Sequence, residues 1–341
     1  MTHRPGPPAR PTLEVVAARA GVSRATASRA LHGSSNVSPQ TREAVLRAAD
    51  EVSYTVNLAA RSLVTRRTDT IAFFVAESED RMFHDPYFLG VLRGAQSEAA
   101  AAGLQLVFAV ASTPAETHQF VRYAVGGHVD GVLLVSLHGD DRLAQALEAG
   151  GVPTVLNGRP LADERLYSVD SDNLAGACAA TELLIARGAR RIATITGPLD
   201  MSAGRDRLAG YRHALRRAHR PVSRALVAEG DFSVDGGARA TAELLGRAPD
   251  VDAVFAASDL TALGAIRVLA ERGMSVPDRV AVVGFDDVGE ARLAAPSLTT
   301  VRQPLGDLGR TMTRILLARI AGEDAARRTV LPVALVRRDS A

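Results

Sequence analysis

The sequence is poor in the residues that build covalent or metal-based sites. It has a single cysteine, Cys178, no tryptophan and only 4% aromatic residues. One cysteine excludes an internal disulfide and a cysteine-cluster metal site, and we expect Cys178 to be a small buried hydrophobe. No nucleophile elbow, metal-ligand spacing or phosphate-binding loop occurs, and the eight histidines are scattered. The sequence therefore argues against an enzyme and predicts neither a metal nor a cofactor.

Long apolar segments are also missing. No apolar run approaches the length of a membrane span. The first ten residues, MTHRPGPPAR, lack the apolar core of a secretory signal. We therefore expect a cytoplasmic protein with no membrane partner, and a disordered tail over residues 1–10.

Charge is unevenly distributed along the chain. The net charge is only +2, yet residues 1–70 hold ten arginines against five carboxylates, which leaves a mildly acidic remainder. A basic N-terminal segment suits nucleic-acid binding, because neutralisation of phosphates drives such binding. The length of 341 residues exceeds one ordinary core and suggests two or three domains.

The segment from Thr12 to Leu31 predicts two short helices joined by a tight turn. Thr12 is a suitable N-cap for the first helix and Ser23 for the second. Gly21 between them can take the positive φ that a sharp turn demands. This pattern is typical of a helix-turn-helix, whose second helix enters the major groove of DNA, although an ordinary pair of antiparallel helices would also produce it. The apolar face of the first helix comprises Leu13, Val16, Ala17 and Ala20.

The second helix carries side chains suited to DNA. Arg24 and Ser28 are four residues apart, as are Ala25 and Arg29, so these four share one broad face. Arginine is well shaped to donate to guanine O6 and N7, and the hydroxyls of Thr26 and Ser28 suit phosphate oxygens.

A third helix is predicted from Ser38 to about Val52. Ser38 is a good N-cap, and Pro39 stands at the first helical position. A segment from Asn57 to Leu63 follows, which alone would be interpreted as a linker. The residues expected to close a three-helix core are Val45, Leu46, Ala49 and Val52.

From Thr12 to its C-terminus, the sequence resembles the LacI/GalR family of bacterial transcription regulators. The resemblance implies a headpiece over residues 11–56, a hinge helix and linker over 57–69, and a two-lobed effector-binding and dimerisation domain over 70–341. In this family paired hinge helices enter the minor groove and wedge a leucine between base steps, a role that Leu63 matches. The expected DNA-binding residues are Thr12, Ser23, Arg24, Ala25, Thr26, Ser28, Arg29, His32, Asn57, Arg61 and Leu63. The chain departs from the usual headpiece at Ala27 and Ala30, where valine is common, and at His32, where asparagine is usual.

Beyond Thr70, apolar strand candidates alternate with amphipathic helices. This alternation is typical of parallel sheets covered on both faces. The resemblance implies two periplasmic-binding-protein-like lobes, which we expect to be connected near residues 158–165 and 286–303, with a last strand-like segment over 330–336. The candidate strands are Ile71–Ala76, Leu104–Val110, Gly131–Ser136, Val152–Leu156, Ile192–Thr196, Ala225–Ala228, Ala253–Ala257 and Val280–Phe285. The helices include Phe88–Ala102, Leu174–Arg187, Ala203–Ala218, Gly237–Arg247 and Leu260–Arg272.

Several polar or aromatic residues directly follow predicted strands, where doubly wound folds bind ligands. Asp85-Pro-Tyr-Phe88 resembles the family's Asn-Pro-Phe-Phe loop, although such an aromatic pair can also be core. Asp259 can equally be a helix N-cap, and Asn157 stands where many sugar-responsive relatives have aspartate. We expect Asp287 to brace the connection and Arg205 to be a surface or lobe-packing residue. The residues expected to bind an effector are Tyr87, Phe88, Asn157, Arg207, Asp259 and Asp286.

The sequence thus predicts a DNA-binding transcription regulator, a repressor that binds a palindromic operator as a homodimer. Its effector is expected to be a small polar molecule, a neutral sugar, with a nucleoside or purine as the alternative. The lack of a C-terminal heptad run favours a dimer over a coiled-coil tetramer. Two other interpretations remain: a sugar-binding module, and an α/β enzyme with an accessory DNA tether.

Overall fold

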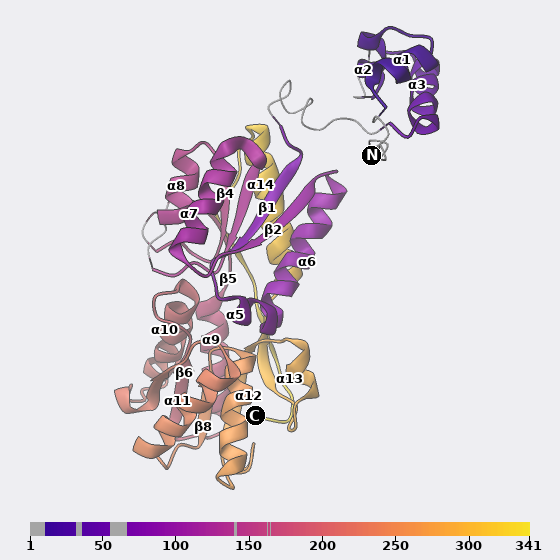
Figure 1. The fold of residues 1–341 in the computed structure, drawn as a ribbon. Helices are drawn as coiled ribbons and strands as arrows, with labels where there is room; N and C mark the ends of the chain where they lie inside the picture. Colours follow the sequence, from indigo (N-terminus) through magenta and orange to yellow (C-terminus); the bar gives the residue numbers. More distant parts are fainter. Residues whose placement is uncertain (1–10, 32–35, 55–66, 140–141, 162, 164) are drawn as a thin grey trace, which may run out of the picture. The chain divides into compact units, whose positions relative to one another are not determined.

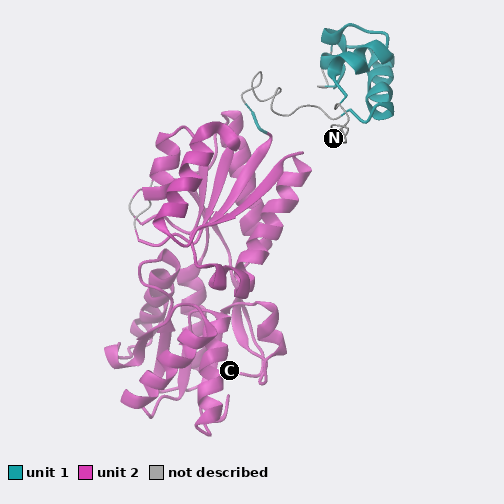
Figure 2. Ribbon diagram, in the orientation of Figure 1, with its two compact units in different colours: residues 1–68 teal, residues 69–341 magenta. Residues whose placement is uncertain are grey.

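The computed structural model describes residues 11–31, 36–54, 67–139, 142–161, 163 and 165–341. The chain divides into two compact units, residues 1–68 and 69–341, which Figure 2 shows in different colours. Among the described residues, no helix is both long and apolar enough to pass through a membrane.

The N-terminal unit is a three-helix structure. Its helices are α1 (Leu13–Arg19), α2 (Arg24–Leu31) and α3 (Pro39–Glu51) (Figure 1). The predicted caps of α2 and α3 are confirmed: Ser23 Oγ accepts from the Thr26 amide at 3.1 Å, and Ser38 Oγ from the Thr41 amide at 3.2 Å. Thr12 occupies the N-cap position of α1, but its side chain makes no cap hydrogen bond.

Small side chains fill the core of this unit. Its buried residues are Val16, Ala17, Ala27, Ala30, Val37, Val45, Ala48 and Ala49. One predicted member was wrong: Leu46 is 50% exposed, because it directly follows the inward-facing Val45 and points about 100° away from it around α3.

The C-terminal unit contains two six-stranded sheets, one in each lobe. The strand order of the first is β2-β1-β3-β4-β5-β11, entirely parallel, and that of the second is β7-β6-β8-β9-β10-β12, with only β12 antiparallel. The first-lobe strands are β1 (Thr70–Val75), β2 (Gln105–Val110), β3 (Gly131–Val135), β4 (Thr154–Asn157), β5 (Tyr167–Ser171) and β11 (Arg328–Leu331). The second-lobe strands are β6 (Ile192–Thr196), β7 (Val227–Glu229), β8 (Ala253–Ala256), β9 (Ala281–Asp286), β10 (Thr299–Arg302) and β12 (Ala334–Val336).

Helices cover both faces of each sheet, which explains why the central strands are continuously apolar. In the first lobe α6 (Pro86–Ala101) and α14 (Leu305–Ala321) cover one face, and α7 (Pro114–Tyr123) and α8 (Arg142–Ala149) cover the other. The two short helices α5 (Glu79–His84) and α13 (Gly289–Leu293) follow β1 and β9.

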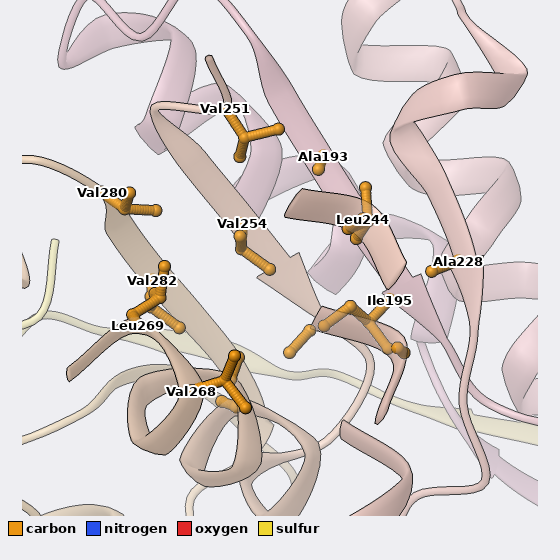
Figure 3. Packing of buried hydrophobic residues seen from close by; sticks show 14 of the residues in the cluster. Ala193, Ile195, Ala228, Leu244, Val251, Val254, Val268, Leu269, Val280 and Val282 are labelled. Atoms are coloured by element: carbon orange, nitrogen blue, oxygen red, sulfur yellow. The ribbon is translucent and has the colours of Figure 1, made fainter. Parts of the chain in front are cut away.

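The second lobe repeats this arrangement. One face carries α9 (Asn173–Ala186) and α10 (Ser202–Arg217), and the opposite face carries α11 (Val234–Arg247) and α12 (Asp259–Glu271). Figure 3 shows the core beneath α11 and α12, where Ile195 and Val254 of the sheet approach Leu244 and Leu269 of the helices.

The chain passes between the lobes three times: from β5 to α9, from β10 to α14, and from β11 to β12. The predicted connection near 158–165 was therefore wrong, and the one near 286–303 was too broad, because only its last residue, Gln303, lies between β10 and α14. Residues 158–165 link two strands of the first sheet, and the second stretch contains α13 and all of β10, both in the second lobe. Both errors arise because β5 and β10 are rich in hydroxyl-bearing residues and lack the apolar run that identifies a buried strand.

The eight predicted strands match β1 to β4 and β6 to β9, with ends that differ by up to two residues. The largest differences lie at the starts of β4 and β7, and before β7 the residues Arg224–Leu226 form a 3-10 turn. The predicted segment 330–336 is divided between β11 and β12, because the chain changes sheets at Pro332 and Val333.

Candidate functional site

A polar cavity lies where the carboxyl ends of the two sheets face each other, the place at which doubly wound sheets bind ligands. It encloses about 760 Å³, including its solvent-open mouth. The residues of the first lobe that line it include Arg81, Asp85, Tyr87, Phe88, Asn157 and Asp170. Those of the second lobe and of its connections include Asn173, Ser202, Arg207, Phe232, Asp286 and Gln303.

Arg207 of α10 is the central cation of the cavity. It is 5% exposed, and its Nε donates to Asn173 Oδ1 at 2.8 Å. Its Nη1 donates to the Ala257 carbonyl and lies 3.5 Å from Asp286 Oδ1. The Phe285 ring centroid is 3.8 Å from the guanidinium carbon. These contacts fix the guanidinium, as buried charge requires.

Asp286 ends β9 with a strained backbone and a buried carboxyl. Its φ is 121°, a conformation that side chains other than glycine rarely adopt. Gln303 Nε2 donates to its Oδ1 at 2.6 Å. Burial raises the pKa of Asp286 to about 7, which outweighs the lowering effect of Arg207. The carboxyl therefore changes protonation near neutral pH.

Asp170, at the end of β5, is a second buried carboxyl of the cavity. Burial, assisted by the nearby charge of Asp206, raises its pKa to about 6. The backbone amide of Arg159 donates to its Oδ2 at 3.1 Å, and the side-chain Nδ2 of Asn173 donates to its Oδ1 at 2.8 Å.

The start of α6 supplies the aromatic part of the cavity. Asp85 caps this helix by accepting from the Tyr87 amide at 3.0 Å. The Tyr87 hydroxyl donates to Asn157 Oδ1 at 2.6 Å, and burial raises the pKa of Tyr87 above its ordinary range. Phe88 is only 1% exposed and meets the Tyr87 ring edge-on at 5.6 Å.

Five of the six residues predicted to bind an effector thus line one cavity; Asp259 does not. Its Oδ2 accepts from the Val288 amide at 2.9 Å, and its Oδ1 accepts from the Thr300 hydroxyl. Asp259 is fully buried, and the N-cap of α12 is Ser258. Its carboxyl therefore ties α12 to β10 and to the turn after β9, which is a structural role.

Arg205 and Asp287 behave as expected. Arg205 is exposed, and its Nε donates to the Leu199 carbonyl at 2.5 Å. Asp287 accepts from Arg302 Nε at 2.6 Å and from Arg338, so it joins β10 to the C-terminal segment.

Other cavity residues were not predicted: Arg81, Asp170, Asn173, Phe232 and Gln303. Asp170 and Asn173 flank the end of β5, a strand that the apolar pattern did not indicate. Gln303 belongs to a segment recognised only as a connection. Phe232 lies in a short loop after β7, for which the sequence offers no signal.

Two ionic contacts join the lobes beside this cavity. Arg159, which follows β4, donates from Nη2 to Asp206 Oδ1 of α10 at 2.8 Å. His138, which follows β3, contacts Asp200 Oδ2 of the second lobe through Nδ1 at 2.9 Å. Its Nε2 lies 2.9 Å from Oε1 of Glu77, which is in the first lobe.

The N-terminal unit presents a polar face on α2. Arg24, Ala25 and Arg29 are exposed, and Thr26 and Ser28 are half-buried. The exposed Thr12 and Ser23 lie at the starts of α1 and α2. Arg24 Nε pairs with Glu14 Oε1 at 2.8 Å in an exposed ion pair. The remaining predicted DNA contacts, His32, Asn57, Arg61 and Leu63, lie outside the described residues.

A helix-turn-helix with exposed arginines, in one chain with a two-lobed body around a polar cavity, defines a ligand-responsive DNA-binding regulator. Two family models match the chain: "Bacterial regulatory proteins, lacI family" over residues 12–57, and "Periplasmic binding protein-like domain" over residues 181–341.

Curated relatives extend this match over nearly the whole chain. The transcriptional regulator CelR of Thermobifida fusca is 52% identical over 329 residues, which are 96% of this chain and 95% of the relative. The regulator AscG of Escherichia coli K12 is 32% identical over 96% of this chain and 98% of its own length. The chain therefore belongs to the LacI family of bacterial transcription regulators, which are not enzymes.

Solved structures agree with this assignment. A CelR–cellobiose complex aligns with a TM-score of 0.79 and 49% identity over 97% of this chain and all of the other. A lac repressor dimer bound to operator and the anti-inducer ONPF aligns with a TM-score of 0.84 and 30% identity over 97% of this chain and 99% of the other.

Proposed function

We propose that the protein is a repressor that binds a palindromic operator as a homodimer and is released from it by a neutral sugar, with cellobiose as the first candidate. The cavity between the lobes carries this proposal. It is lined by oriented donors and acceptors together with aromatic rings, the combination that recognises a hydroxyl-rich ring with one apolar face.

The charges of the cavity favour a neutral effector. Three guanidinium groups line it, and each has a carboxylate partner: Arg81 pairs with Glu77, Arg159 with Asp206, and Arg207 with Asp286. These carboxylates offset the positive charge of the arginines and would repel an anionic ligand. A neutral sugar can instead share them, since carboxylates accept from hydroxyls and guanidiniums donate to them. The complex of the related CelR with cellobiose supports this class of ligand.

A binding experiment tests the sugar directly. Calorimetry with cellobiose, glucose, ribose and adenosine should show the tightest binding for cellobiose. Asp286→Ala should abolish the sugar response and leave operator binding intact, because Asp286 lies in the body and not in the helix-turn-helix. Asp250→Ala is a matched control, since Asp250 forms an exposed ion pair with Arg191. Equal cellobiose binding by wild type and Asp286→Ala would reject the assignment, and preferred binding of adenosine would favour a nucleoside effector.

We further propose that each headpiece reads one half-site through the exposed face of α2. Arg24 and Arg29 would contact base edges, while Thr12, Ser23, Ala25, Thr26 and Ser28 would lie against the backbone or the bases. Leu63 remains the proposed minor-groove wedge, with His32, Asn57 and Arg61 near the DNA.

Exposed apolar side chains support a homodimer built on the body. Phe83 of α5 is 64% exposed, Leu89 of α6 is 50% exposed and Leu293 of α13 is 87% exposed. Figure 1 shows α6 and α13 along one side of the body and α5 beside the start of α6. A second copy of the chain would remove this apolar surface from water. Sedimentation should give a dimer for wild type and a monomer for a Leu89→Asp, Leu293→Asp double variant; an unchanged dimer would place the interface elsewhere.

A further inference from the structure

Arg81 reaches into the cavity from α5, the short helix between β1 and α6. Its guanidinium carbon lies 5.8 Å from the ring centroid of Phe88 in the first lobe and 5.2 Å from that of Phe232 in the second. Its Nη1 pairs with the Glu77 carboxylate. Arg81 is therefore held by contacts to both lobes, and it lines the cavity from the first lobe, whereas Arg207 lines it from the second.

Several N–H donors of the Arg81 guanidinium have no hydrogen-bond partner among the described residues. An arginine carries five N–H donors, and within the described part of the chain the side chain of Arg81 hydrogen-bonds only to Glu77. Its Nε is buried and has no hydrogen-bond partner there. A buried, unsatisfied donor on a charged group is costly and is rarely retained without a role. Nε and Nη2 are therefore the donors of Arg81 that no described residue uses, and a molecule in the cavity must approach the guanidinium closely to reach the buried Nε.

The second guanidinium of the cavity lies near the same aromatic ring. The Arg207 guanidinium carbon is 5.5 Å from the Phe232 ring centroid, and the remaining contacts of Arg207 fix it in the second lobe. A ring-shaped ligand beside Phe232 would thus lie within reach of one arginine from each lobe.

We propose that Arg81 is a specificity-determining residue that donates from its Nε–Nη2 edge to oxygen atoms of one ring of the bound sugar. This inference rests on the proposed sugar-binding function and adds a residue of the first lobe to the residues that contact the sugar. The planar guanidinium can donate to two neighbouring oxygens at once, which lysine cannot reproduce. The sugar completes the hydrogen bonding of Arg81 and so favours the arrangement in which both lobes contact it.

Calorimetry on the full-length protein with cellobiose as the probe tests this assignment. Arg81→Met keeps the length of the side chain and removes its donors, so it should weaken cellobiose binding about 10- to 100-fold, the effect of losing hydrogen bonds to a charged donor. Arg81→Lys keeps the charge beside Glu77 and should also bind about 10-fold more weakly. Arg217→Met is the matched control, because Arg217 forms an exposed ion pair with Glu182 away from the cavity and should bind cellobiose like wild type.

Deoxy analogues of cellobiose separate ligand contact from a purely structural role. If Arg81 donates to particular hydroxyls, the losses caused by Arg81→Met and by removal of those hydroxyls should be strongly non-additive. Losses that are additive for every deoxy analogue, or cellobiose binding by Arg81→Met as tight as wild type, would overturn the proposal. Wild-type protein that binds no cellobiose would overturn the proposed function and this inference with it.

Discussion

At the scale of single residues, buried charge is concentrated in the cavity between the lobes. Asp85, Asp170 and Asp286 are each less than 9% exposed, and burial raises the pKa of all three. Burying carboxyls and the Arg207 guanidinium together costs stability unless every group is well paired. Such a cost is typical of a binding site, where local stability is sacrificed for oriented polar groups.

Single residues on α2 should determine which operator is read. Arg29 is exposed on the face opposite the buried Ala27 and Ala30. Arg29→Ala should cost about 1–3 kcal/mol of operator binding and relax specificity at one base pair of each half-site. Arg47→Ala on α3 removes an exposed arginine outside that face and should leave specificity unchanged. Binding assays with single-base operator variants measure both effects, and unaltered specificity in Arg29→Ala would show that another residue reads the base.

At the scale of elements, close helix packing depends on glycine where α6 and α14 cross. A Cβ on Gly309 would collide with the Val91 carbonyl, and one on Gly94 with the Gly306 carbonyl. The backbones of the two helices are therefore in direct contact, which places α14 against the first lobe after the chain leaves β10.

Gly309→Ala should destabilise the protein by about 1–3 kcal/mol, because the added methyl group has backbone on its far side and cannot be accommodated by a rotamer change. Gly246→Ala on α11 is the control. A Cβ there meets no atom within 4 Å, so the substitution should be neutral or stabilise by up to about 1 kcal/mol. Denaturant unfolding measures both, and equal stabilities for the two variants would contradict the close packing of α6 on α14.

The loops that follow β1, β3 and β6 carry a pH-sensitive contact. His138 bonds to Glu77 and to Asp200, and Arg81 also faces Glu77. Hydrogen bonds to Glu77 and Asp200 raise the pKa of His138 above its ordinary value of 6.5, against the effect of burial. Protonated His138 therefore stabilises the contact between lobes at low pH, and this contribution is lost as pH rises through the raised pKa.

Cellobiose affinity should consequently fall more steeply in wild type than in His138→Gln as pH rises above the ordinary histidine pKa of 6.5. Asp170 and Asp286 titrate in part of the same range, so the informative quantity is the difference between the two proteins at each pH. Calorimetry at several pH values measures this difference in cellobiose affinity. Parallel profiles for wild type and His138→Gln would show that the contact does not contribute to sugar binding.

At the scale of the whole molecule, the proposed release by a sugar requires that the sugar and the operator act on each other through the same conformational equilibrium. The cavity has walls from both lobes, so a ligand there distinguishes arrangements of the lobes. If cellobiose weakens operator binding by some factor, typically about 5- to 150-fold, the operator must weaken cellobiose binding by that factor.

This reciprocity can be measured with titrations of cellobiose into free protein and into the protein–operator complex. Non-operator DNA of equal length is the control and should change the cellobiose affinity little. An identical cellobiose affinity with and without operator would refute release by the sugar.

The sequence by itself determined the features that depend on local signals. Ser23, Ser38 and Pro39 identify helix starts within a few residues of themselves, and apolar runs identify the central strands. Arg207 and Asp286 were identified through motifs that match the family. These features could be predicted because neither caps nor apolar runs need knowledge of distant residues.

Only the tertiary structure decided how the remaining segments are used. Thr299 and Thr300 of β10 are fully buried although their sequence is polar, because β9 and β12 pair with this strand on either side. Asp259 is removed from the cavity by hydrogen bonds to residues about 30 and 40 positions away. Arg81 and Phe232 meet although they belong to different lobes. Such roles depend on which distant residues the fold brings into contact, and no local pattern encodes that.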